Sequence, residues 1–100
     1  MIDLPRPLFS LGRILVTPAA HEAVERAGAS IDELVERHVS GDWGDVDVDD
    51  ANANAEAVST GARILSAYAL PKGGRVWVMT EAMGRNRERR ATTVLLPNEY

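Results

Sequence analysis

The chain has 100 residues, and its balance of 45% hydrophobic and 26% charged residues is typical of one globular domain. It contains no cysteine, which excludes a disulfide framework, a thiolate zinc site and a cysteine nucleophile. The net charge is -4, but residues 1–60 hold four Arg against twelve Asp and Glu, whereas residues 61–100 hold seven Lys and Arg against three acids, so partners meet two halves of opposite charge.

Two prolines, Pro5 and Pro7, disfavour helix near the start of the chain. We therefore predict an extended lead-in over residues 1–11 and a single α+β domain over residues 12–100. The start lacks the basic segment and the unbroken apolar segment of an export signal, and no apolar run approaches the roughly 20 residues that span a bilayer. We expect a cytoplasmic protein without a membrane segment.

One strand and two helices are predicted next. Residues 12–16, Gly-Arg-Ile-Leu-Val, have the composition of a short strand. Thr17, which is followed by proline, begins a helix that ends at Gly28. A capping box that starts at Ser30 begins a second helix, and this helix stops at Gly41.

The segment from Asp42 to Asp50, here called the acidic loop, contains five carboxylates and no basic residue. Asp49 or Asp50 can cap a third helix that runs to about Ser59, and Trp43 can anchor the loop in the core. We predict that the loop binds a protein partner through six residues: Asp42, Trp43, Asp45, Asp47, Asp49 and Asp50.

Three runs rich in β-branched, aromatic and aliphatic residues, 61–70, 75–81 and 91–96, are separated by turn formers and predict an antiparallel meander. Together with the strand at 12–16, they predict an α+β fold. We expect a four-stranded, mainly antiparallel sheet with three short helices packed mainly on one face.

The Pro-Lys-Gly-Gly turn between the first two runs predicts a four-residue hairpin loop, in which Leu70 pairs with Arg75 and Tyr68 lies opposite Trp77. Tyr68, Trp77 and Met79 then share one side of the sheet, here called the aromatic face. An aromatic surface of this kind is a candidate site for a protein partner or for a second copy of the chain. The alternative is that the lead-in and the region of Leu95 or Leu96 fold over it.

The turn before the last run carries four guanidinium groups, at Arg85, Arg87, Arg89 and Arg90, here called the arginine turn. Guanidinium groups bind phosphates and aromatic rings stack on bases, so such a turn beside an aromatic face is typical of some RNA-binding sheets and ribonuclease toxins. The acidic half of the chain opposes nucleic acid, and a solvated hairpin tip is the simpler explanation.

A metal site is not predicted. Asp45, Asp47, Asp49 and Glu56 match four positions of the calcium-loop pattern, but Asp50 stands where that pattern needs a glycine for its sharp turn. The simpler interpretation of the acidic loop is a solvated segment whose last aspartate caps a helix.

The two histidines do not predict a catalytic centre. His21 and Glu25 have the spacing of a zinc-protease helix, but that motif needs a second histidine at the later position. We expect His38, at the end of a helix, to be a residue whose positive form suits the helix C-terminus. Neither histidine has a partnered Ser and Asp pattern, so we expect no enzyme, no metal and no cofactor.

Five blocks of the sequence resemble a small, uncharacterised bacterial family that is carried on plasmids, phages and integrative elements. Members are labelled plasmid-related proteins and sometimes type I restriction subunits. The resemblance brings no activity, cofactor or catalytic residue, and the turn at 83–90 is longer and richer in arginine than is usual in the family. The blocks are Gly12–Pro18, His38–Asp45, Gly61–Tyr68, Val76–Ala82 and Thr92–Tyr100.

The resemblance implies a setting, because small acidic proteins of mobile elements often occlude host machinery. We therefore predict a non-catalytic, protein-binding module, monomeric or homodimeric, that inhibits a host nucleic-acid-handling defence complex, in an anti-restriction or anti-CRISPR role, through the acidic loop. The alternative is a nucleic-acid-binding protein or ribonuclease-like toxin that uses the arginine turn.

Overall fold

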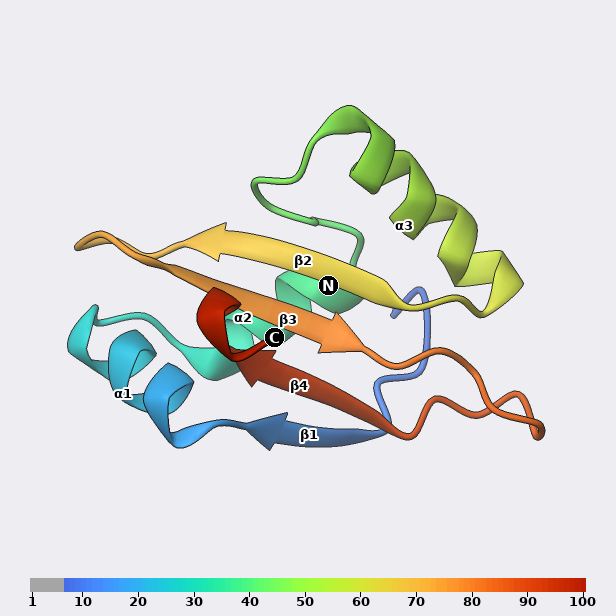
Figure 1. The fold of residues 1–100 in the computed structure, drawn as a ribbon, viewed down its shortest axis with the longest axis horizontal. Coiled ribbons are helices and arrows are strands. Elements are labelled where there is room, and N and C mark those ends of the chain that lie inside the picture. Colours follow the sequence, from blue (N-terminus) through green and yellow to red (C-terminus); the bar gives the residue numbers. More distant parts are fainter. Residues whose placement is uncertain (1–6) are drawn as a thin grey trace, which may run out of the picture.

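Four strands form one mixed sheet with the order β1-β4-β3-β2 in this computed structural model, which describes residues 7–100 (Figure 1). The last three strands form the predicted antiparallel meander, and β1 pairs with β4 in parallel. The predicted α+β fold with a four-stranded, mainly antiparallel sheet is confirmed. The strands are β1 (Arg13–Val16), β2 (Ile64–Ala69), β3 (Arg75–Thr80) and β4 (Ala91–Leu95).

Three α-helices and a terminal 3-10 turn accompany the sheet. They are α1 (Pro18–Arg26), α2 (Ile31–Val39), α3 (Val48–Thr60) and η1 (Pro97–Glu99). Side-chain caps begin the first two helices as predicted: the Thr17 hydroxyl accepts from the Ala20 N–H, and the Ser30 hydroxyl accepts from the Glu33 N–H. Figure 1 shows α2 behind β3 and α3 beside β2.

The third helix begins earlier than predicted. Its cap is Asp47, whose carboxylate accepts from the Asp50 N–H at 2.8 Å, so neither Asp49 nor Asp50 has this role. Both of those residues lie in the first turn of α3, where negative charge is favourable. Gly61 ends the helix, as predicted, in the left-handed conformation with φ of 86°.

The register of the β2–β3 hairpin differs from the prediction by one residue. Ala69 pairs with Arg75, and Tyr68 lies opposite Val76, because Leu70 belongs to the loop instead of to the strand. The Leu70 side chain is buried in the core, and its backbone N–H donates to the Gly74 carbonyl across a turn with two positive-φ glycines. A shift of one residue moves every β2 side chain to the other side of the sheet.

The core lies on the side of the sheet that faces α1 and α2. Tyr68, Val76 and Val94 pack there against Val24 and Leu34, and all five are buried. On the opposite side, Trp77 and Met79 are half-buried, and the ring of Tyr100 lies 5.5 Å from the Trp77 ring.

The end of the lead-in belongs to the core. Phe9 is buried against Val39, Ala57 and Ile64, while the Leu8 N–H donates to the Val39 carbonyl. The first six residues of the predicted lead-in lie outside the described part of the chain. Within residues 7–100, we find no helix with the length and apolar character needed to cross a membrane.

Candidate functional site

The acidic loop is attached to the outer edge of β2. The Trp43 carbonyl accepts from the Ala67 N–H at 3.0 Å, and the Asp45 N–H donates to the Ala67 carbonyl at 2.7 Å. Gly44 between them has φ of 73°, and a Cβ atom there would lie 2.0 Å from the Ala67 carbonyl oxygen. This part of the loop therefore needs glycine, and it pairs with β2 as a one-residue parallel strand.

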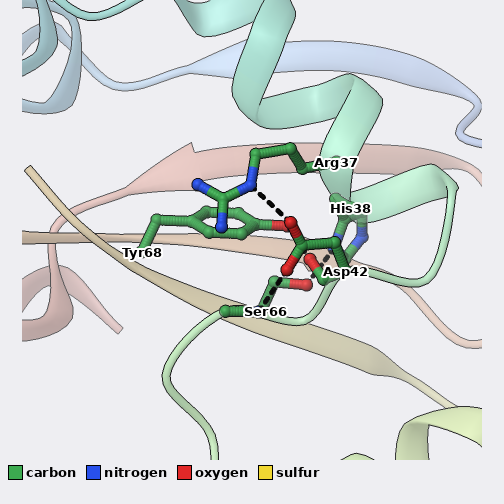
Figure 2. A network of polar contacts seen from close by, with 6 residues as sticks. Arg37, His38, Asp42, Ser66 and Tyr68 are labelled. Atoms are coloured by element: carbon green, nitrogen blue, oxygen red, sulfur yellow. Dashed lines mark hydrogen bonds and ion pairs between the residues drawn. The ribbon is translucent and has the colours of Figure 1, made fainter.

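A polar network fixes the start of the loop (Figure 2). The Arg37 Nε donates to a carboxylate oxygen of Asp42 at 2.7 Å, and the guanidinium lies over the Tyr68 ring, 4.5 Å from its centroid. The Tyr68 hydroxyl donates to the Asp42 carbonyl at 2.6 Å. The hydrogen bond from Arg37 lowers the pKa of the Asp42 carboxyl, and burial raises the pKa of Tyr68 to about 12.

Trp43 anchors the loop from the other side. Its ring stacks on Phe9, with centroids 6.3 Å apart, and meets His38 edge to face at 6.1 Å. Trp43 was predicted to bind a partner, but it is half-buried. It therefore packs against the fold more than it offers surface to a partner. Asp42, bound by Arg37, likewise holds the loop in place.

The remaining acids of the loop face solvent. Asp45, Asp47, Asp49 and Asp50 are exposed, and within residues 7–100 none of them has a basic side chain in ion-pair contact. Val48 lies among them with 74% of its surface exposed. A single exposed apolar residue is common on protein surfaces, so Val48 adds apolar area to the acidic surface without forming a patch of its own.

A buried hydrogen-bond chain lies below the loop and contains His38. The Thr92 hydroxyl donates to the Leu11 carbonyl, so the hydrogen between Thr80 and Thr92 belongs to Thr80. The hydrogen between Thr80 and His38 Nε2 then belongs to the ring, which leaves Nδ1 as the acceptor of the Ser66 hydroxyl at 2.6 Å. Each hydrogen in this series of hydrogen bonds has one acceptor.

This arrangement corrects the prediction that His38 is a charged residue at a helix end. The side chains of His38, Ser66, Thr80 and Thr92 have no exposed surface. Burial, together with the positive charge of Arg89, lowers the pKa of His38 to about 4, so the ring is neutral. The Ser66–His38 contact has the geometry of a nucleophile and a base, but a substrate cannot reach it in this conformation.

The structure separates the residues of the predicted aromatic face. Tyr68 is 1% exposed and lies on the core side, whereas Trp77 and Met79 lie on the opposite side. The one-residue difference in the hairpin loop is the cause. Within the described residues, the lead-in packs in the core through Phe9 and does not cover Trp77. Leu95 lies opposite Trp77 in the β3–β4 pairing, and the Tyr100 ring contacts the Trp77 ring.

The arginine turn is also divided. Arg89 is 3% exposed, and its guanidinium donates to three backbone carbonyls, those of Ala57, Ala62 and Glu81. It also lies over the Phe9 ring, 5.5 Å from the centroid. Its Nε is also buried and has no hydrogen-bond partner among the described residues. Arg89 is therefore an internal connector, and its burial prevents contact with phosphate. Arg85, Arg87 and Arg90 are exposed.

A hollow of about 550 Å³ lies between α1, the β2–β3 loop and η1, away from the acidic loop. Leu70 and Leu96 contribute to its apolar floor. The basic side chains at its rim, Arg26, Lys72 and Arg75, are all exposed, so they form no fixed group that would select one ligand. Over residues 7–100, His, Asp and Glu side chains do not gather in groups of three that could hold a metal ion.

Sequence reasoning missed two residues that contribute to this surface, Arg37 of α2 and Val48 of the loop. Arg37 was not linked to Asp42, although the turn at Gly41 brings residues five apart together. Val48 was overlooked, although an apolar residue in a run of aspartates is a visible signal. No protein-family model, curated protein or solved structure matches the chain. The resemblance to a mobile-element family therefore stays a prediction.

Proposed function

We propose that this protein is a non-catalytic binding module whose acidic loop holds a basic surface of another protein. The observation that supports the proposal most strongly is that some residues of the loop attach it to the fold while others expose their carboxylates to solvent. Asp42, Trp43 and Gly44 attach it to α2 and β2, while Asp45, Asp49 and Asp50 are exposed and form no ion pair with any residue of the described range 7–100. A loop that is ordered before binding loses less entropy when the partner arrives.

The chemistry of the loop indicates the kind of partner. Free carboxylates select a surface rich in Lys and Arg, and Val48 adds an apolar contact at their centre. A nucleic-acid groove of a host protein has such a surface. The family resemblance implies a mobile-element setting, and the proposed partner is therefore a host restriction or CRISPR complex in the cytoplasm.

A charge-matched pair of variants tests the proposal. The triple variant Asp45→Asn, Asp49→Asn and Asp50→Asn removes three negative charges from the loop and leaves the cap Asp47 in place. The control, Glu25→Gln, Glu81→Gln and Glu88→Gln, removes three exposed charges elsewhere. We expect the loop variant to weaken capture of the partner by about tenfold or more, and the control to retain it.

The measurement is a pull-down from nuclease-treated host lysate with all three proteins at equal concentration, read by quantitative mass spectrometry. The proposal predicts a protein that the wild type and the control capture and the loop variant releases. Equal capture by the loop variant and the wild type would contradict it, provided that urea unfolding shows both to be folded.

Nucleic-acid binding by the arginine turn is the second candidate. It is supported by the exposed guanidinium groups of Arg85, Arg87 and Arg90 on one turn, and it is weakened by the burial of Arg89 and of Tyr68. A gel-shift titration with RNA and DNA over a range of salt separates the two candidates. Binding that weakens steeply with salt and is lost in an Arg85→Ala, Arg87→Ala, Arg90→Ala variant would favour this second function.

A further inference from the structure

The two edges of the sheet differ in whether other groups bond their outward backbone groups. At the β2 edge, the Asn54 side chain bonds both the N–H and the carbonyl of Leu65, and the acidic loop bonds both groups of Ala67. At the other edge, β1 is the outermost strand, and Figure 1 shows no described element along its outer side. Ile14 and Leu15 there are 44% and 42% exposed. An apolar open edge favours pairing with another strand.

The backbone of β1 shows which groups are available for such pairing. The Arg13 N–H donates to the Arg90 carbonyl, and the Thr17 N–H donates to the Val94 carbonyl, so both point inward to β4. Alternate residues of a strand direct their backbone groups to opposite sides. The N–H and carbonyl groups of Ile14 and Val16 therefore point outward.

These outward groups define a self-complementary register. Two antiparallel copies of β1 centred on Leu15 place Ile14 opposite Val16 of the other copy, and each such pair exchanges two hydrogen bonds. A twofold axis at Leu15 therefore gives four hydrogen bonds. It also brings the two exposed Leu15 side chains together on one side of the sheet, and Ile14 against Val16 on the other.

Charge supports the same register. Pairing centred on Leu15 places Arg13 opposite Thr17 of the other copy. The Thr17 hydroxyl donates to the Glu99 carboxylate at 2.7 Å, so that carboxylate lies on the side of the strand where Arg13 also points. Each Arg13 thus meets a carboxylate of the other copy.

We propose that two copies of this chain associate through antiparallel β1–β1 pairing centred on Leu15, which joins their sheets into one sheet of eight strands. The two acidic loops lie at the far β2 edges of that sheet. Seven strand spacings of about 4.8 Å separate these edges by about 34 Å, so the dimer offers two acidic surfaces at once. The interface involves only one short strand from each copy, so we expect a dimer that dissociates on dilution.

Sedimentation velocity of the full chain over about 10 to 500 µM tests the proposal, with dimers expected at the upper end. Ile14→Pro removes an outward N–H and none that bonds β4, so it should raise the dissociation constant about tenfold or more. Leu15→Lys should do the same by placing like charges opposite each other. The control Leu8→Lys changes an apolar residue of similar exposure, 48%, away from the β1 edge, and it should have no effect.

A charge exchange tests the register itself. Arg13→Glu and Glu99→Lys each place like charges across the interface and should weaken self-association. An equimolar mixture of the two variants restores opposite charges between the copies, so heterodimers should form where neither variant dimerises alone. A monomeric wild type at the highest concentration would overturn the proposal, as would dimers insensitive to both Ile14→Pro and Leu15→Lys with circular dichroism unchanged.

Discussion

A neutral histidine is fixed by the hydrogen bonds around it. His38 accepts from Ser66 and donates to Thr80, and protonation of Nδ1 would place a donor against the Ser66 hydroxyl. Both the lost hydrogen bond and the burial of a charge raise the free energy of the protonated folded state. Both effects therefore lower the pKa of His38. The sequence offered no signal for it, because a histidine in the last turn of a helix is usually explained by the helix dipole.

The pKa of His38 predicts a loss of stability in mild acid. The unfolded chain takes up the proton near pH 6.5, whereas the folded chain stays neutral to about pH 4. The free energy of unfolding should therefore fall between pH 6.5 and pH 4, by about 3 kcal/mol in total. Urea unfolding at several pH values measures the fall, and His38→Gln should reduce it in that window.

The other histidine, His21, is exposed, and His21→Gln is the matched control for replacing a histidine by glutamine. If His38→Gln does not fold, the NMR chemical shifts of the His38 ring in the wild type still give the answer. A titration midpoint near 6.5 for His38 would contradict this account.

Single residues also explain why the arginine turn was predicted only in part. Four arginines in six positions look equivalent in the sequence, and nothing in their spacing distinguishes Arg89. Its role depends on three carbonyl groups from distant segments, which the fold brings together around one guanidinium. Contacts of this kind have no local sequence signature.

At the scale of elements, local signals predicted most of the fold. The caps Thr17 and Ser30 and the terminating Gly61 act within one helical turn, so the sequence shows them directly. The hairpin register depends instead on whether Leu70 enters the core or extends the strand. That choice is made by tertiary packing, and it decided the composition of both sheet faces.

The attachment of the acidic loop to β2 gives a prediction at this scale. Gly44→Ala would place a methyl group against the Ala67 carbonyl in a positive-φ conformation, so the loop must leave β2. We expect a loss of about 2 kcal/mol or more in the free energy of unfolding, measured by urea, together with faster amide exchange at Asp45 and Ala67.

Gly73→Ala is the matched control. Gly73 also has a positive φ, of 97°, but a Cβ atom added there would have nothing within 4 Å, so only the backbone cost of about 1 kcal/mol applies. Equal losses for the two variants, with unchanged exchange at Asp45 and Ala67, would show that the loop does not depend on this contact.

At the scale of the whole molecule, the charge asymmetry of the sequence becomes a spatial feature. Exposed acids gather where the acidic loop enters α3, and three exposed arginines lie on the turn between β3 and β4. Composition alone predicted two candidate surfaces of opposite charge. It could not show which charges were free, because the pairing of Asp42 and the burial of Arg89 depend on the complete fold.

Hydrogen–deuterium exchange of the protein, alone and bound to the partner captured in the pull-down, tests most directly whether the acidic loop is the binding surface. If the acidic loop contacts the partner, exchange is slower over residues 42–50 in the complex and unchanged over residues 84–90. Slower exchange confined to residues 84–90, or to the β3 segment that carries Trp77 and Met79, would contradict it.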